Sequence, residues 1–211
     1  MEKITILLVD DHKLIRDSWA FVLNSDPRFQ VIGETGDGNE AVFIAKDKRP
    51  RIVLMDINMT PMNGIEATKL IRKFSPESKI IGVSMHSMPT YTRKMLQAGA
   101  AGYVTKNSTK EELMTAILEV NSGHKYICHE VKDNLSKDTI EEEDGKPGKQ
   151  ELSLRELDVM EHIKEGLSSK EIGLKLGITL KTVEVHRYNI LKKLKLKNVA
   201  SLVNYMNLHG M

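Results

Sequence analysis

The stretch ITILLVDDH, residues 4–12, begins with six apolar or β-branched residues and continues into two adjacent acids, Asp10 and Asp11. A continuous apolar run of that length is typical of a strand buried on both faces of a sheet. A second run, residues 52–55, is also followed by an acid, Asp56. The carboxyl ends of parallel strands meet at one edge of a sheet, so we expect the three carboxylates to lie close together.

Three convergent carboxylates repel one another unless a cation lies between them. Mg²⁺ prefers oxygen ligands and keeps several waters, so these acids predict a magnesium site. Each acid taken alone also fits a simpler interpretation, an ordinary side chain in a solvated turn. The residues at the ends of later strands decide between the two interpretations.

Apolar runs alternate with segments of helical periodicity over residues 1–124. The strand-like runs are residues 4–9, 30–34, 52–55, 80–84 and 102–104. Leu14, Ser18, Phe21 and Val22 mark the first helix by their spacing. Five strand-like runs alternating with five helical segments predict an α/β fold, a doubly wound five-stranded parallel sheet covered on both faces.

Two further polar residues belong at the edge of the sheet that carries the acids. Ser84 ends the fourth strand-like run, and Lys106 follows the fifth. A carboxylate nucleophile, a metal, an ammonium group and a hydroxyl together suit phosphoryl transfer, in which the protein positions groups and neutralises charge. Taken separately, Lys106 also fits a surface lysine and Ser84 a helix cap.

This arrangement resembles the flavodoxin-like receiver domain of two-component response regulators over residues 1–124. The matching motifs, in order, are LLVDDH (7–12), LMDINM (54–59), GIEA (64–67), Ser84 and GAAGYVTK (99–106). Because these motifs recur in the family's order and spacing, the resemblance is specific, and it covers the whole predicted α/β domain.

The resemblance implies that Asp56 accepts a phosphoryl group from the phosphohistidine of a histidine kinase or from acetyl phosphate. It also implies that Asp11, Asp56 and the backbone carbonyl of Asn58 bind Mg²⁺ directly, with Asp10 acting through water. Asn58 and His86 occupy positions at which members of the family tune the lifetime of the phosphoaspartate.

Three residues would then respond to phosphorylation. By the same resemblance, Lys106 would contact a phosphoryl oxygen, Ser84 would hydrogen-bond to it, and Tyr103 would turn inward as Ser84 moves. The chain departs from the family pattern at one place, because Thr60 stands where proline is usual and Pro61 comes next. This departure concerns the conformation of the loop more than the chemistry.

The 211-residue chain has a formal net charge of only +2, but charge is distributed unevenly along it. Residues 130–146 carry seven acids and three lysines, with almost no large apolar side chains. Such a composition cannot bury enough surface to order itself, so we predict a flexible linker over residues 125–149. From Leu167 onward, eight basic residues are accompanied by two glutamates, the kind of local basic surface expected for nucleic-acid binding.

Residues 150–211 show helical periodicity only and predict a second, all-α domain of four helices. Ser168 and Glu171 form a capping box for a short helix, Gly177 ends it, and Thr179 begins a longer helix. This is the pattern of a helix-turn-helix motif, whose second helix enters the major groove of DNA. The residues expected to contact bases or phosphates are Lys181, Thr182, Glu184, Val185, Arg187, Tyr188, Lys192 and Lys193. A small helical domain for protein docking is the alternative.

The same residues resemble the LuxR/NarL-type DNA-binding domain. The matching pieces are LSLRE (152–156), GLSSKEIGLKLGI (166–178) and KTVEVHRYNILKKL (181–194). The two halves together resemble a NarL/FixJ-type response regulator. This implies a transcription regulator that binds double-stranded DNA and forms a homodimer when phosphorylated.

Two features of the C-terminal domain cannot be carried over directly from the family. Basic residues are frequent where this chain has Glu184 and Tyr188, so the base preference stays open. The last helix often carries dimer contacts, which makes Val199, Leu202 and Val203 candidates. Packing within the domain's own core is the alternative for these three residues.

Two other classes of function fit parts of the sequence. The first is an enzyme on the same sheet, such as a metal-dependent phosphatase or a nucleotide binder, but no glycine-rich phosphate loop follows the first strand. The second is a DNA-binding protein whose first domain only dimerises, but the complete set of polar residues at the sheet edge argues against it. No apolar run approaches the ~20 residues of a membrane helix, so we expect a cytoplasmic protein with no membrane partner.

Overall fold

The computed structural model describes residues 2–85, 87, 89–135 and 152–208. His86 and residues 136–149 of the predicted linker lie outside the described residues. The chain divides into two compact units, and the described residues before and after this segment belong to different units. No helix among the described residues is long and apolar enough to cross a membrane.

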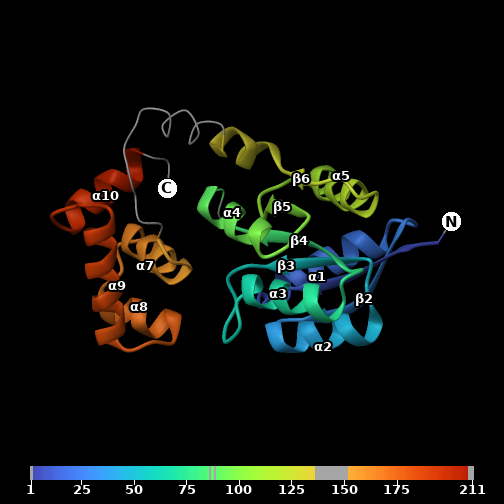
Figure 1. Cartoon of the computed structure of the whole chain (residues 1–211), viewed down its shortest axis with the longest axis horizontal. Helices are drawn as coiled ribbons and strands as arrows, with labels where there is room; N and C mark the ends of the chain where they lie inside the picture. Colours follow the sequence, from blue (N-terminus) through green and yellow to red (C-terminus); the bar gives the residue numbers. More distant parts are fainter. Residues whose placement is uncertain (1, 86, 88, 136–151, 209–211) are drawn as a thin grey trace. The chain divides into compact units, whose positions relative to one another are not determined.

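The first unit is built on a sheet in which every pair of neighbouring strands is parallel, in the order β2-β1-β3-β4-β5-β6 (Figure 1). The strands are β1 (Ile4–Val9), β2 (Phe29–Thr35), β3 (Ile52–Asp56), β4 (Lys79–Ser84), β5 (Gly102–Thr105) and β6 (Tyr126–Ile127). The five predicted strands are therefore present, and a short sixth strand is added at one edge. Since β1 and β3 are neighbours, with Val9 opposite Met55, the acids that follow them share one edge of the sheet.

Helices cover both faces of this sheet. They are α1 (Lys13–Asn24), α2 (Gly38–Lys48), α3 (Gly64–Phe74), α4 (Pro89–Gln97) and α5 (Lys110–Asn121). Helix α3 contacts both α2 and α4, so these three form one layer. Trp19 in α1 and Leu113 in α5 line a common pocket against the sheet, so α1 and α5 belong to the other layer. The doubly wound arrangement predicted from the sequence is confirmed.

Helix α1 leaves two of its large apolar side chains exposed to solvent. Leu14 and Phe21 are 79% and 77% exposed, whereas Ala20 and Leu23 are buried. Leu14 and Phe21 lie two turns apart on one face of the helix, and Ala20 and Leu23 lie on another. The helix therefore carries two apolar faces, and packing against the sheet decides which of them is buried.

Residues 126–135, in the first part of the predicted linker, form secondary structure in the first unit. Tyr126 and Ile127 pair with Gly102 and Tyr103 as strand β6, and residues 129–135 are helical. Cys128 and Val131 are fully buried. The start of the predicted linker is wrong because these few apolar side chains, although sparse in the sequence, cover the open edge of β5 and gain burial there.

The described residues of the second unit form the four predicted helices. They are α7 (Leu154–Lys164), α8 (Ser169–Leu176), α9 (Leu180–Lys193) and α10 (Val199–Leu208). The capping box of Ser168 and Glu171 is present at the start of α8, and Gly177 ends α8 with φ 63°, a left-handed conformation that favours glycine. Thr179 caps α9 by accepting a hydrogen bond from the amide of Thr182. The buried apolar residues of the four helices are Leu157, Val159, Met160, Ile163, Ile172, Val183, Ile190, Leu202 and Met206.

Candidate functional site

The three predicted acids converge at the carboxyl edge of the sheet. Asp10 and Asp11 follow β1, Asp56 is the last residue of β3, and these acids and His12 each offer a ligand atom within 4.8 Å of the others. Asp10 and Asp56 are only 6% and 2% exposed, whereas Asp11 is accessible to solvent. The site therefore combines two buried carboxylates with one at its mouth.

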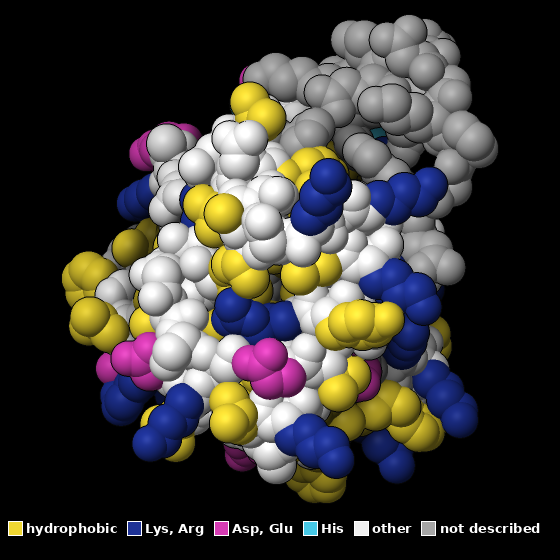
Figure 2. All heavy atoms as spheres, turned by 90° about the vertical axis from the view of Figure 1, so that its left-hand side faces the viewer, with side chains coloured by type: hydrophobic (Ala, Val, Ile, Leu, Met, Phe, Trp, Pro, Cys, Tyr) yellow, Lys and Arg dark blue, Asp and Glu magenta, His cyan; other side chains and the backbone are white. Residues whose placement is uncertain are grey.

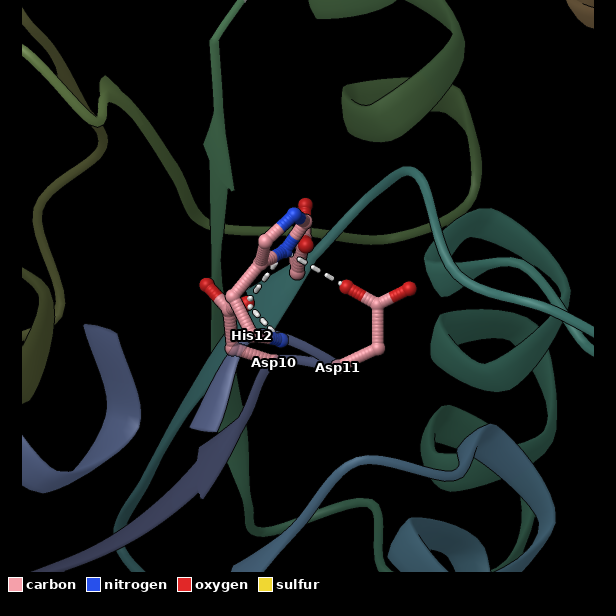
Figure 3. Close-up of side chains that lie close together, drawn as sticks. Asp10, Asp11 and His12 are labelled. Atoms are coloured by element: carbon pink, nitrogen blue, oxygen red, sulfur yellow. Dashed lines mark hydrogen bonds and ion pairs between the residues drawn. The ribbon is translucent and has the colours of Figure 1, made fainter. Parts of the chain in front are cut away.

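His12 was not among the predicted site residues, yet its ring lies against the two acids that precede it (Figure 3). Its Nδ1 is 2.7 Å from Oδ1 of Asp11 and 3.2 Å from Oδ1 of Asp10, and its backbone N–H donates to Asp10 at 2.8 Å. Arg16, one turn later, donates to the backbone carbonyl of Asp10. Their positions directly after the acid pair and in the first turn of α1 are the signal that could have identified them.

Lys106 lies between the two buried acids. Its Nζ is 2.7 Å from Oδ2 of Asp10 and 2.8 Å from Oδ2 of Asp56, and its side chain is only 5% exposed. The lysine predicted from the end of the fifth strand-like run is thus a buried cation of the site and not a surface residue. Its backbone N–H donates to the carbonyl of Ser84 at 2.7 Å, which ties the ends of β4 and β5 together.

The charges of this site are incompletely balanced. Burial raises the pKa of Asp56 from 3.8 to about 6; Lys106 opposes this rise and the negative charge of Asp10 adds to it. For Lys106, burial disfavours the charged form, but the two carboxylates outweigh it and raise the pKa. One ammonium group serves two buried carboxylates, so a further cation would lower the energy of the ionised site.

Ser84, Tyr103 and Asn58 lie in or directly after strands β4, β5 and β3. Ser84 is fully buried at the end of β4, and the backbone N–H of Asn58 donates to Oδ1 of Asp56 at 3.2 Å. Tyr103 is also fully buried, with its hydroxyl hydrogen-bonded to the side chain of Ser84, and burial raises its pKa. Tyr103 therefore points inward in this structure, and its response to phosphorylation stays a prediction.

The loop after β3 returns very close to the acceptor strand. A Cβ at Gly64 would lie 1.9 Å from the backbone oxygen of Asp56, so only glycine allows α3 to start there. The side chain of Asn63 caps α3 by accepting from the amide of Glu66. The Thr60–Pro61 peptide bond in this loop is cis.

The donor set fits a hard divalent cation. Asp10, Asp11 and Asp56 supply carboxylate oxygens, the ligands that Mg²⁺ prefers, and the accessible Asp11 leaves room for retained waters. Among the described residues, this is the one group of acids and histidines close enough to hold a metal ion. The fold therefore brings together the residues that the sequence predicts for phosphoryl transfer.

The second unit presents the predicted face of α9 to solvent. Lys181, Glu184, Val185 and Tyr188 are all exposed, whereas Val183 and Ile190 of the same helix are buried. Thr182 and Arg187 are half-buried and Lys192 is exposed. On the face seen in Figure 2, where α8, α9 and α10 lie towards the viewer, basic side chains predominate over acidic ones.

Two predicted residues of this unit have a different environment from the one expected. Nζ of Lys193 lies 2.7 Å from Oε2 of Glu156, which is 3% exposed, so this lysine neutralises a buried acid instead of facing a phosphate. Leu202 is 1% exposed and belongs to the core of the unit, which is the alternative left open for the dimer candidates. Val199 and Val203 are half-buried.

Comparison with known proteins agrees with this geometry. Residues 6–118 match the response regulator receiver domain, and residues 150–206 match the bacterial regulatory proteins of the luxR family. The transcriptional regulatory protein MctR of Rhizobium johnstonii is 37% identical over 208 residues, which cover 99% of this chain and 95% of MctR. This chain belongs to the LuxR-type response regulators. The response regulator UvrY of Escherichia coli is 34% identical over 208 residues, with the same coverage.

Solved structures have the same fold. A LuxR-family two-component response regulator from Aurantimonas sp. is 31% identical, with a TM-score of 0.63, covering 66% of this chain and 99% of that one. RcsB of Salmonella enterica, solved bound to the rprA promoter with a phosphomimetic, covers 98% of this chain and 99% of its own at a TM-score of 0.65. At 22% identity, this second likeness concerns the fold alone. The family matches over both parts of the chain make this response regulator a transcription regulator.

Proposed function

We propose that Asp56 of this response regulator accepts a phosphoryl group from the phosphohistidine of a histidine kinase or from acetyl phosphate. The convergence of Asp10, Asp11, Asp56 and Lys106 at one sheet edge is the observation that supports this most strongly. Asp11, Asp56 and the backbone carbonyl of Asn58 would hold Mg²⁺, and Asp10 would act through water. When bound, Mg²⁺ neutralises the negative charge that gathers between the carboxylate and the incoming phosphoryl group.

Asp56, Lys106 and Ser84 would each have one role in the transfer. A carboxylate oxygen of Asp56 forms a bond to phosphorus as the P–N bond of the donor imidazole breaks, and the imidazole takes up a proton. Lys106 needs only to shift its Nζ from the carboxylates to the new phosphoryl oxygens. The hydroxyl of Ser84, buried next to the site, donates to the same group.

Phosphorylation is tested by incubating the protein with acetyl phosphate and Mg²⁺ and measuring intact mass. We expect one acid-stable, base-labile phosphoryl group on the wild type and none on Asp56→Asn. Asp47→Asn, an exposed acid on α2, is the matched control and should be modified like the wild type. An unmodified wild type, or modification that persists in Asp56→Asn, would contradict the assignment.

We propose further that α9 reads double-stranded DNA in the major groove. Lys181, Thr182, Glu184, Val185 and Tyr188 would approach base edges, and Arg187 and Lys192 would contact phosphates. The exposure of this face and the positive charge around it support the assignment. A homodimer, formed on phosphorylation and using Val199 and Val203, would bind two half-sites. Its DNA ligand would place the protein in the bacterial cytoplasm.

DNA binding is tested by the salt dependence of affinity for a selected duplex. Lys192→Ala should weaken binding at every sequence and reduce the slope of log affinity against log salt by about 1, because one phosphate contact is lost. Lys164→Ala, at the end of α7, is the control and should leave both quantities unchanged. A complex whose affinity is insensitive to salt would favour protein docking as the role of this unit.

A further inference from the structure

The segment that follows β5, residues 126–135, is attached to β5 and to the loop after β4. These are the two elements that position Lys106 and Ser84. Strand β6 pairs with β5, and the backbone N–H of Cys128 donates to the carbonyl of Tyr103 at 3.0 Å. The helical residues 129–135 follow directly, with Val131 fully buried. The segment that continues towards the second unit is therefore anchored beside β5, the strand that contains Tyr103.

The first attachment is at the end of β5. The hydroxyl of Thr105 donates to Oε2 of Glu130 at 3.0 Å. Thr105 is buried and is the residue immediately before Lys106, whose ammonium group lies between Asp10 and Asp56. Thr105 and Lys106 share the end of β5, so a backbone movement there that accompanies the new contact of Lys106 would also move the hydroxyl of Thr105 relative to Glu130.

The second attachment is in the loop after β4. Nδ2 of Asn134 donates to the backbone carbonyl of Ser87 at 3.2 Å. Ser87 lies three residues after Ser84, whose hydroxyl is the other group expected to turn towards a phosphoryl oxygen. Ser84 and Lys106 are joined by a backbone hydrogen bond of 2.7 Å, so the two loops can respond together.

Glu130 and Asn134 are one helical turn apart, so they lie on the same face of the helical segment. We propose that this face reads the state of Asp56, with Glu130 and Asn134 as positioning residues that act through Thr105 and Ser87. The two hydrogen bonds hold the unphosphorylated arrangement, and phosphorylation releases them as both loops move. A contact that differs between two states biases their equilibrium by the difference in its free energy.

This inference rests on the proposed phosphorylation of Asp56 and names the residues that transmit it. It is tested on the full chain with Glu130→Ala and Asn134→Ala, measuring affinity for a selected duplex with and without acetyl phosphate and Mg²⁺. We expect the affinity of the unphosphorylated protein to rise, so that the gain on phosphorylation falls by about fivefold, within the range usual for coupled sites. The amount of phosphorylated protein, measured by intact mass, should be unchanged.

Two control variants separate this role from mere support of the fold. Asp133→Ala removes an exposed carboxylate from the same helical segment and should leave the gain unchanged. Glu130→Gln keeps an oxygen that can accept from Thr105 and should restore the wild-type gain. If Glu130→Ala and Asn134→Ala keep the full gain, or weaken both states equally, the inference is overturned. Failure of the wild type to become phosphorylated would instead overturn the proposed function.

Discussion

Each unit of this response regulator contains a buried carboxylate held by a lysine, and the two pairs have nearly equal lengths. Asp56 lies 2.8 Å from Lys106 in the first unit, and Glu156 lies 2.7 Å from Lys193 in the second. Their pKa values nevertheless move in opposite directions. Burial dominates for Asp56 and raises its pKa; burial acts on Glu156 too, but hydrogen bonds from Lys193 and Ser153 outweigh it and lower the pKa.

Burial is the largest cause of the raised pKa of Asp56, and the number of negative charges that share each lysine adds to the difference between the two sites. Lys106 serves both Asp10 and Asp56, whereas Glu156 has Lys193 and also accepts from the backbone N–H of Ser153 at 2.6 Å. The first site therefore keeps negative charge that a bound metal ion can neutralise. The second is satisfied internally and serves the fold, because a neutralised acid has no remaining affinity for a ligand.

The largest effect is expected from breaking the satisfied pair. Lys193→Ala leaves Glu156 buried without its cation and should lower the free energy of unfolding of the second unit by about 2–3 kcal/mol, somewhat less than for a fully buried pair because the lysine is partly exposed. Amide hydrogen exchange of α7–α9 measures this. Lys192→Ala, an exposed neighbour, should change stability by only a few tenths of a kcal/mol. Equal effects of the two substitutions would make the ion pair irrelevant to stability.

Removing one carboxylate from the first site should raise stability, whereas breaking the pair in the second unit lowers it. With metal removed by a chelator at pH 7, Asp56→Asn should stabilise the first unit by on the order of 2 kcal/mol, because it removes one of two carboxylates that compete for Lys106. Trp19 is the only tryptophan, so fluorescence during urea unfolding reports this unit. Mg²⁺ should reduce the advantage of Asp56→Asn over the wild type.

The same site predicts a pH dependence. The folded protein binds a proton at Asp56 more tightly than the unfolded chain does, since the pKa is raised from 3.8 to about 6. The stability of the metal-free wild type relative to Asp56→Asn should therefore fall as the pH rises through this window, and level off above it. For Glu156, whose pKa is lowered, the stabilisation should be present at neutral pH and be lost on acidification below its ordinary value of 4.5. If the stability contributions of Asp56 and Glu156 changed in the same direction with pH, the proposed difference between the two sites would be wrong.

The smallest effect on stability is expected from removing a helix cap in the second unit, where two capping boxes can be compared. Ser153 and Ser168 both open helices through capping boxes, but Ser153 supports the buried Glu156, whereas Ser168 supports the exposed Glu171. Ser153→Ala should lower stability by about 1 kcal/mol, and Ser168→Ala by less, because solvent can replace its hydrogen bond. Thermal unfolding followed by circular dichroism ranks the two. The reverse ranking would show that burial of Glu156 does not strengthen its cap.

Much of the candidate site follows from local sequence pattern. Asp10, Asp56, Ser84 and Lys106 each end or follow a strand-like run, and parallel strands bring such positions to one edge. Lys193 shows the limit of this reasoning. Helical periodicity places it near a basic surface but does not reveal the buried glutamate, thirty-seven residues away in the chain, that takes its charge.

Local sequence pattern was enough to predict the alternation of strands and helices, the edge at which the acids meet, and the exposed face of α9, because these depend on short-range periodicity. The three-dimensional packing was needed to show which face of α1 is buried and that β6 pairs with β5. It also showed that Glu130 contacts Thr105 and that Asn134 contacts Ser87. These depend on contacts between residues distant in the chain. Whether a charge is balanced or left over depends on how many partners the fold brings within reach, which no local pattern records.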